Sequence, residues 1–112
     1  MIGNFPKRGS VYWVSLDPAI GSETKKTRPC LIISNDSGNE ASGMVIVAPI
    51  TSKVKKIYSF EVEVTISGKR GKVMVNQCRT IDKSRLGKKE CSLDFEVMEE
   101  VNEAIRITFG IS

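Results

Sequence analysis

The 112-residue chain contains no histidine, and this absence narrows the chemistry available to it. Histidine is the usual acid–base group near neutral pH and a frequent metal ligand. The sequence therefore excludes Ser-His and Cys-His nucleophile pairs, the two-histidine kind of ribonuclease and most zinc and iron sites. Cys30, Cys78 and Cys91 are odd in number and lack C-x-x-C spacing. We expect reduced thiols, with Cys30 buried, and neither a metal nor another cofactor.

Long apolar runs, repeats and low-complexity tracts are missing as well. No segment approaches the ~20 apolar residues that span a bilayer, and residues 1–16 lack the apolar centre and cleavage site of a signal peptide. The length suits one core without disulfide or metal support. We therefore expect a single domain over residues 1–112, soluble and cytoplasmic.

The net charge of +4 is distributed unevenly along the chain. Residues 92–112 contain five acids and one base, a net of −4, so residues 1–91 carry +8. Such a basic body with an acidic end indicates a surface that faces a polyanion. A lysine-rich surface that serves only solubility is the alternative.

Short apolar runs separated by Gly, Ser, Asn and Lys predict a β-rich domain. The clearest strand is Phe60–Ile66, in which apolar residues alternate with Glu61, Glu63 and Thr65. Its hairpin connection is expected at Ser67–Gly71. Pro49 is expected to push the end of its strand out of the ladder. The other predicted strands are Val11–Leu16, Cys30–Ser34, Met44–Ile50, Lys72–Asn76 and Arg79–Ile81.

The carboxy-terminal segment changes to a helical period. Leu93, Val97 and Val101 recur on one face, followed by Ala104 or Ile105. Ser92 or Asp94 can cap the start of this helix, and Ile107–Ile111 is predicted as a closing strand. The fold class is therefore mainly β, a small barrel or strongly bent antiparallel sheet with a carboxy-terminal α-helix.

Three long connections are the expected places for function, because loops on a rigid sheet often carry it. They are Asp17–Thr27, Asn35–Gly43 and Thr51–Ser59. The first and third are flanked by basic side chains, and they would form one basic mouth if they lay on the same side of the sheet. These side chains are Lys25, Lys26, Arg28, Lys53, Lys55 and Lys56.

Three segments together resemble the MazF/PemK family of toxin endoribonucleases from toxin–antitoxin systems. They are RGSVYWVSLDPAIGSETKKTRPCLIISND (Arg8–Asp36), VIVAPITSK (Val45–Lys53) and NQCRTIDKSRL (Asn76–Leu86). With the carboxy-terminal helix they cover nearly the whole chain in order. The specific features are the TRP tripeptide before an apolar strand, then P-I-T-S, then Q-x-R-T-I-D.

The resemblance implies an SH3-like and CcdB-like barrel that acts as a homodimer. It implies metal-independent, sequence-specific cleavage of single-stranded RNA, including mRNA. The products would carry 2′,3′-cyclic phosphate and 5′-hydroxyl ends, and translation would be inhibited. The implied partner is an acidic, MazE-like antitoxin that covers the RNA-facing side.

The same match assigns catalysis to Arg28 and Thr51. Arg28 would donate to the non-bridging phosphate oxygens, where charge grows in the transition state, and Thr51 would donate a hydrogen bond from its hydroxyl group to the same centre. A guanidinium is a poor base at neutral pH, so charge stabilisation is the role expected of it. The alternatives are a surface charge for Arg28 and a turn hydroxyl for Thr51.

The RNA-binding residues expected from the resemblance are Lys25, Lys26, Ser52, Lys53, Asn76 and Gln77. The lysines would contact phosphates, and Gln77 would read a base edge, unless it is merely a solvated strand residue. Members of the PemK branch have an acidic residue where this chain has Asn76. Asn76 is a poor proton acceptor, so the role expected of it is recognition of a base. The sequence does not identify the group that accepts the proton of the 2′-hydroxyl.

Other polar and aromatic residues have structural interpretations. Of the neighbouring pair Tyr12 and Trp13, one is expected to face the core and the other the surface, with Trp13 in the core; an exposed ring would be able to stack on a base. Asn35 and Asp36 are expected to build a turn. Arg79, Asp82 and Arg85 are expected to form an ion-pair framework.

Two rival functions remain at this stage. The first is a non-catalytic poison of the CcdB type, which binds DNA gyrase, although the joint presence of TRP and P-I-T-S weighs against it. The second is an RNA-binding module without activity. RNA cleavage separates the leading hypothesis from both.

Overall fold

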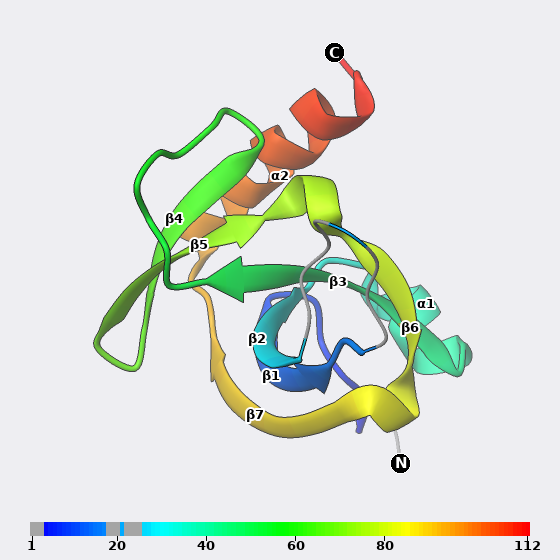
Figure 1. Ribbon diagram of the computed structural model, residues 1–112. Coiled ribbons are helices and arrows are strands. Elements are labelled where there is room, and N and C mark those ends of the chain that lie inside the picture. Colours follow the sequence, from blue (N-terminus) through cyan, green and yellow to red (C-terminus); the bar gives the residue numbers. More distant parts are fainter. Residues whose placement is uncertain (1–3, 18–20, 22–25) are drawn as a thin grey trace.

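The computed structural model describes residues 4–17, 21 and 26–112, which form a curled antiparallel sheet with one long helix packed against it (Figure 1). The elements, in chain order, are β1 (Ser10–Ser15), β2 (Thr27–Ile32), α1 (Asp36–Ala41), β3 (Met44–Thr51), β4 (Glu61–Ile66), β5 (Lys69–Met74), the 3₁₀ turn η1 (Val75–Gln77), β6 (Arg79–Asp82), the 3₁₀ turn η2 (Lys83–Arg85), β7 (Leu86–Ser92) and α2 (Phe95–Phe109). The predicted fold class, mainly β with a carboxy-terminal helix, is confirmed.

The strand order is β4-β5-β3-β2-β1-β7, with β6 also paired to β3. β3 is the central strand, because β6 pairs with its first half, Met44–Val47, and β5 with its end, Ile50–Thr51. The turn η1 connects these two partners. The strands bend as they pass from one partner to the next, and β7 closes around the opposite side from β4 (Figure 1).

The sheet buries apolar residues on both faces. One cluster joins Val62 and Val64 of β4 to Val101 and Ala104 of α2, where the helix covers the β4–β5 end (Figure 1). A second cluster, formed mainly by residues of β1, β2, β3 and β6, contains Cys30, which is fully buried as predicted. Two separate cores of this kind hold the ends of β2 and β3 in fixed positions.

The structure corrects the predicted strand ends around the prolines. β2 begins at Thr27 instead of Cys30, so Arg28 belongs to the strand. Pro29 lies opposite Trp13 near the start of β2, where proline is tolerated. The prediction for Pro49 was wrong, since β3 continues through it to Thr51 and pairs with β5.

The β4–β5 hairpin is tighter than expected. Ile66 pairs with Lys69, which leaves a two-residue turn. Ser67 and Gly68 both have positive φ, 49° and 79°, as a type I′ hairpin turn requires. β5 therefore starts three residues earlier than predicted, and Val75–Gln77 forms η1 instead of extending the strand.

The predicted helix is α2, and Asp94 caps it by accepting a hydrogen bond from the Val97 amide at 3.0 Å. The predicted strand Ile107–Ile111 was wrong. The helix continues to Phe109 and ends at Gly110, whose φ of 67° suits a left-handed cap. In the described ranges, no helix is sufficiently long and apolar to cross a membrane.

One helix and one strand were not predicted. The short helix α1 lies where a connection was expected, and Asn35 accepts from the Gly38 amide at 2.7 Å as its N-cap. β7 was not predicted because its sequence, LGKKECS, has neither an apolar run nor a clear alternation of apolar and polar residues. Its strand conformation comes from pairing with β1, which local sequence does not reveal.

Candidate active site

The register of β2 and β3 brings Arg28 and Thr51 to the same place. The antiparallel ladder between the two strands ends at the Cys30–Pro49 pair, and Arg28 and Thr51 each lie two residues beyond this pair, at the same end of the ladder. Adjacent strands lie about 5 Å apart. Both residues line one pocket of about 340 Å³.

This pocket, called here the central pocket, is strongly basic. It lies between the start of β2, the end of β3, the β4–β5 hairpin and β7. Its charged residues are four bases and one acid, namely Lys26, Arg28, Lys69, Arg70 and Glu90. The remaining lining residues are Trp13, Thr27, Pro29, Ile50, Thr51, Ser52, Ile66, Ser67 and Gly71. This excess of positive charge suits an anionic ligand.

Thr51 is buried apart from its opening to this pocket, with 9% of its surface exposed. Its Oγ1 accepts a hydrogen bond from the Lys53 amide at 3.2 Å. This bond uses a lone pair and leaves the hydroxyl hydrogen available for donation. The geometry therefore suits a hydrogen bond from Thr51 to a phosphate oxygen.

Gly71 is required by the close approach of β5 to β3 beside Thr51. A Cβ atom placed on Gly71 would lie 2.9 Å from the Thr51 carbonyl oxygen and 3.3 Å from Cγ2 of Ile50. The position of Thr51 thus depends on a residue without a side chain in the neighbouring strand.

The base of Arg28 is fixed by the buried end of β2. The Cys30 thiol donates to the Arg28 carbonyl oxygen at 3.6 Å. Burial raises the pKa of Cys30 to about 12, against the opposing positive charges of Arg28 and Arg79. Cys30 is consequently a neutral packing residue at physiological pH and no candidate nucleophile.

The amino-terminal side of β2 is held by Lys26. Its amide donates to Asp17 Oδ1 at 2.9 Å, and its carbonyl accepts from the Leu16 amide at 3.0 Å. Lys26 also has φ of 67°, an uncommon conformation for a residue with a side chain. Backbone outliers of this kind often occur at functional sites.

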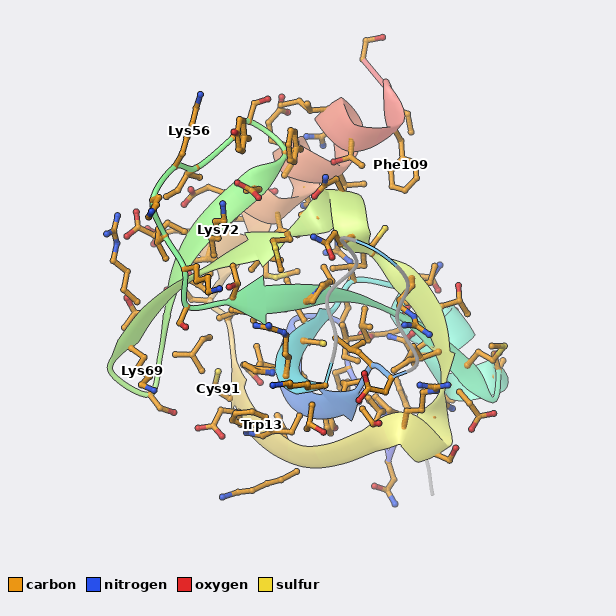
Figure 2. All side chains as sticks on the ribbon, in the orientation of Figure 1. Trp13, Lys56, Lys69, Lys72, Cys91 and Phe109 are labelled. Atoms are coloured by element: carbon orange, nitrogen blue, oxygen red, sulfur yellow. The ribbon has the colours of Figure 1, made fainter. Side chains whose placement is uncertain are left out.

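A second basic hollow, the lysine groove, is lined by Lys53, Lys55, Lys56, Tyr58 and Lys72 and has a volume of about 470 Å³. Lys72 holds the wall of this groove together, because its ammonium group donates to Glu61 at 2.9 Å and to the Lys56 carbonyl at 2.7 Å. Figure 2 shows Lys56 and Lys72 on the same side of the molecule.

Comparison with known proteins identifies the family. The family model for PemK-like, MazF-like toxins of type II toxin–antitoxin systems matches residues 7–109. The chain belongs to this family. It is similar to Endoribonuclease EndoA of Bacillus subtilis, with 41% identity over 111 residues, which cover 94% of this chain and 95% of the relative.

Solved structures of family members have the same fold. MazF from Deinococcus radiodurans superposes with a TM-score of 0.83 at 30% identity, covering 95% of this chain and 97% of that one. A MazE–MazF structure from the same organism gives a TM-score of 0.77 at 27% identity, covering 96% and 98%. These similarities favour the toxin-endoribonuclease hypothesis over the CcdB-type alternative.

The predicted site residues divide into groups. Arg28, Thr51, Ser52 and Lys26 line the central pocket, whereas Lys53 lines the lysine groove. Lys25 lies outside the described residues. Asn76 and Gln77 occupy η1, which packs against β3 and α2, and neither is among the described lining residues of the two hollows.

The remaining framework predictions need correction. Trp13 was expected in the core, but it is 37% exposed and lines the central pocket, whereas Tyr12 packs against buried residues. In the described part of the chain, Arg79 and Arg85 bond to backbone carbonyls instead of forming close ion pairs. Arg79 donates to Leu16 at 3.0 Å, and Arg85 donates to Ser15 and Asp17 at 3.0 and 2.7 Å. Asp82 accepts from the Ser84 amide at 2.9 Å, and the hydrogen bonds from Ser84 and the positive charge of Arg85 lower the pKa of its carboxyl group.

Sequence reasoning missed Trp13, Ser67 and Glu90 as pocket residues. The hydroxyl of Ser67 and the indole N–H of Trp13 both donate to Glu90 and lower the pKa of its carboxyl group. Glu90 therefore stays ionised at neutral pH. No local signal marked it, because it lies in the polar strand β7.

Proposed function

We propose that this chain is the toxin of a type II toxin–antitoxin system and a metal-independent, sequence-specific endoribonuclease that cleaves single-stranded RNA. Arg28 and Thr51 in one basic pocket of a MazF/PemK family member carry the proposal. Cleavage of mRNA would inhibit translation, and a protein acting on mRNA would work in the cytoplasm.

In the proposed reaction, the 2′-oxygen of the RNA attacks the adjacent phosphorus and the bond from phosphorus to the 5′-oxygen breaks. The 2′-hydroxyl loses its proton and the leaving 5′-oxygen gains one. The products are a 2′,3′-cyclic phosphate and a 5′-hydroxyl. Arg28 stabilises the charge that grows on the non-bridging oxygens, and Thr51 donates a hydrogen bond from its hydroxyl group to one of them.

The proposed partners follow the family. A homodimer would be the active form, and a cognate acidic antitoxin of the MazE type would cover the basic surface. The charge arrangement supports this partner, because acidic side chains would complement the four bases of the central pocket and the lysine groove.

Mapping of cleavage products tests the proposed function. The purified protein is incubated in EDTA with a long single-stranded RNA, and the new ends are sequenced and tested for 2′,3′-cyclic phosphate. Cuts at a short recurring sequence are expected. RNA binding without cutting would favour the inactive binding module, and capture of gyrase with no RNA cleavage would favour the CcdB-type poison.

The lysine groove gives a second prediction, because residues that line it adjoin residues of the central pocket along the chain. Thr51 and Ser52 line the pocket, and Lys53 lines the groove; on the paired strand, Gly71 lines the pocket and Lys72 the groove. RNA leaving the pocket would therefore cross the groove, where lysines contact phosphates.

Replacing Lys55 and Lys56 with glutamine is expected to weaken RNA binding and to reduce its salt dependence. Each lost phosphate contact lowers the slope of log K against log salt by about 0.7 for single strands. Titrations of labelled RNA at several salt concentrations measure this slope. Lys83→Gln, in η2 at the far end of β3, is the matched control and should leave the slope unchanged. An unaltered slope in the double variant would remove the groove from the RNA path.

A further inference from the structure

One wall of the central pocket is a side-chain network built from three different elements. Trp13 from β1 donates its indole N–H to Glu90 Oε1 at 2.9 Å. Ser67, in the turn between β4 and β5, donates its hydroxyl to Glu90 Oε2. Glu90 lies on β7, so one carboxylate fixes both the indole ring and the hairpin turn.

The backbone of β7 departs from regular pairing at this position. Val11 pairs with Cys91, but the next residue, Tyr12, pairs with Lys89. Glu90 is thus the additional residue of a bulge. Bulges redirect side chains and are frequent beside active sites. At this bulge, the side chain of Glu90 faces the central pocket.

A second irregularity on β7 allows the strand to approach Trp13. The pairing shifts again between Tyr12 and Val14. A Cβ atom on Gly87 would lie 3.1 Å from the Trp13 carbonyl oxygen, closer than most real Cβ contacts. The two bulges and Gly87 therefore place β7 around the Trp13 ring.

The Trp13 ring remains open to the pocket although its N–H is used. The side chain lies beneath the β4–β5 turn and beside β7 in Figure 2, and 37% of the residue is exposed. The indole N–H is bonded to Glu90, so Trp13 can contact a ligand only through the face of its ring. An indole face in a basic pocket suits a nucleobase attached to a phosphate.

We propose that Glu90 is a positioning residue that holds Trp13 and the Ser67 turn as a fixed wall, against which a nucleobase next to the cleaved phosphate stacks. This inference deepens the proposed function and rests on it. The role of Glu90 is indirect, because it acts through the ring that it orients.

Trp13 is the sole tryptophan of the chain, so its fluorescence reports the ring directly. Glu90→Ala should shift the emission and increase quenching by acrylamide. Glu90→Gln should restore both, because an amide oxygen can also accept the indole N–H. Glu40→Ala removes an exposed carboxylate from α1 and serves as the control for net charge.

Binding is measured with random-sequence, fully 2′-deoxy octanucleotides, which lack the attacking hydroxyl. Fluorescence anisotropy of the labelled probe should show about fivefold weaker binding for Glu90→Ala, the effect of losing one typical hydrogen bond. Trp13→Ala should weaken binding about 10- to 100-fold. Glu90→Gln and Glu40→Ala should bind within about twofold of the unmodified protein.

A double-mutant cycle distinguishes orientation of the ring from general stabilisation. Trp13→Phe retains a ring but loses the N–H, so adding Glu90→Ala to it should cost less than about twofold. Equal effects of Glu90→Ala in both backgrounds, or unchanged tryptophan emission, would overturn the proposal. If Glu90→Ala fails to fold, Glu90→Leu, which removes the acceptor at similar volume, takes its place in the cycle, and equal effects in both backgrounds would likewise overturn the proposal. Because the probe cannot be cleaved, absent RNA cleavage would count against the proposed function alone.

Discussion

Replacing Arg28 with alanine is expected to reduce the rate of RNA cleavage about a thousandfold, the upper range for loss of a donor to transition-state charge. Arg28 reaches the central pocket from the start of β2, whose next residues are anchored by Pro29 and the buried Cys30. Its forked donors match the non-bridging oxygens of phosphate, and charge grows on those oxygens only as the reaction proceeds. The loss should therefore appear mainly in kcat.

The measurement is single-turnover cleavage of a labelled RNA, with circular dichroism and thermal unfolding to show that the variant is folded. Arg106→Ala is the matched control. Arg106 lies on α2, where it is exposed and pairs with Glu103 at 3.2 Å, so its loss should leave the rate within about twofold. Cleavage by Arg28→Ala at the rate of the unmodified protein would remove Arg28 from catalysis.

Replacing Gly71 with alanine is expected to impair both stability and activity. The new Cβ would lie 2.9 Å from the Thr51 carbonyl oxygen, so β3 or β5 must shift. Overpacking of this kind costs about 1–3 kcal/mol of unfolding free energy. Since the displaced residue is Thr51, cleavage should fall at least about tenfold, because misplacement by 1 Å can cost about a hundredfold.

Urea unfolding and single-turnover cleavage measure the two effects of Gly71→Ala. Gly43→Ala is the matched control, because an added Cβ there meets nothing within 4 Å and Gly43 has no positive φ. Thr51→Val, which deletes the hydroxyl at nearly constant volume, shows what loss of the hydroxyl alone does to the rate. If Gly71→Ala kept full activity, the position of Thr51 would not limit the reaction.

Local sequence patterns predicted much of the fold. Alternation in Phe60–Ile66 predicted β4, and helical spacing from Leu93 onward predicted α2. Such periods record which side of an element is buried, and this information is contained in neighbouring residues. The same patterns failed for β7 and for Ile107–Ile111, because the first is stabilised by its neighbour β1 and the second continues a helix that nothing interrupts before Gly110.

The sequence alone determined the family, through TRP, P-I-T-S and Q-x-R-T-I-D in order, and with it the candidates Arg28 and Thr51. Only the tertiary structure decided which side chains share a pocket with them. It set Lys53 in a separate groove, left Asn76 and Gln77 on η1, and brought Trp13 and Glu90 together from opposite ends of the chain. Such proximity depends on strand register and on two bulges in β7, and these arise from pairing between distant segments.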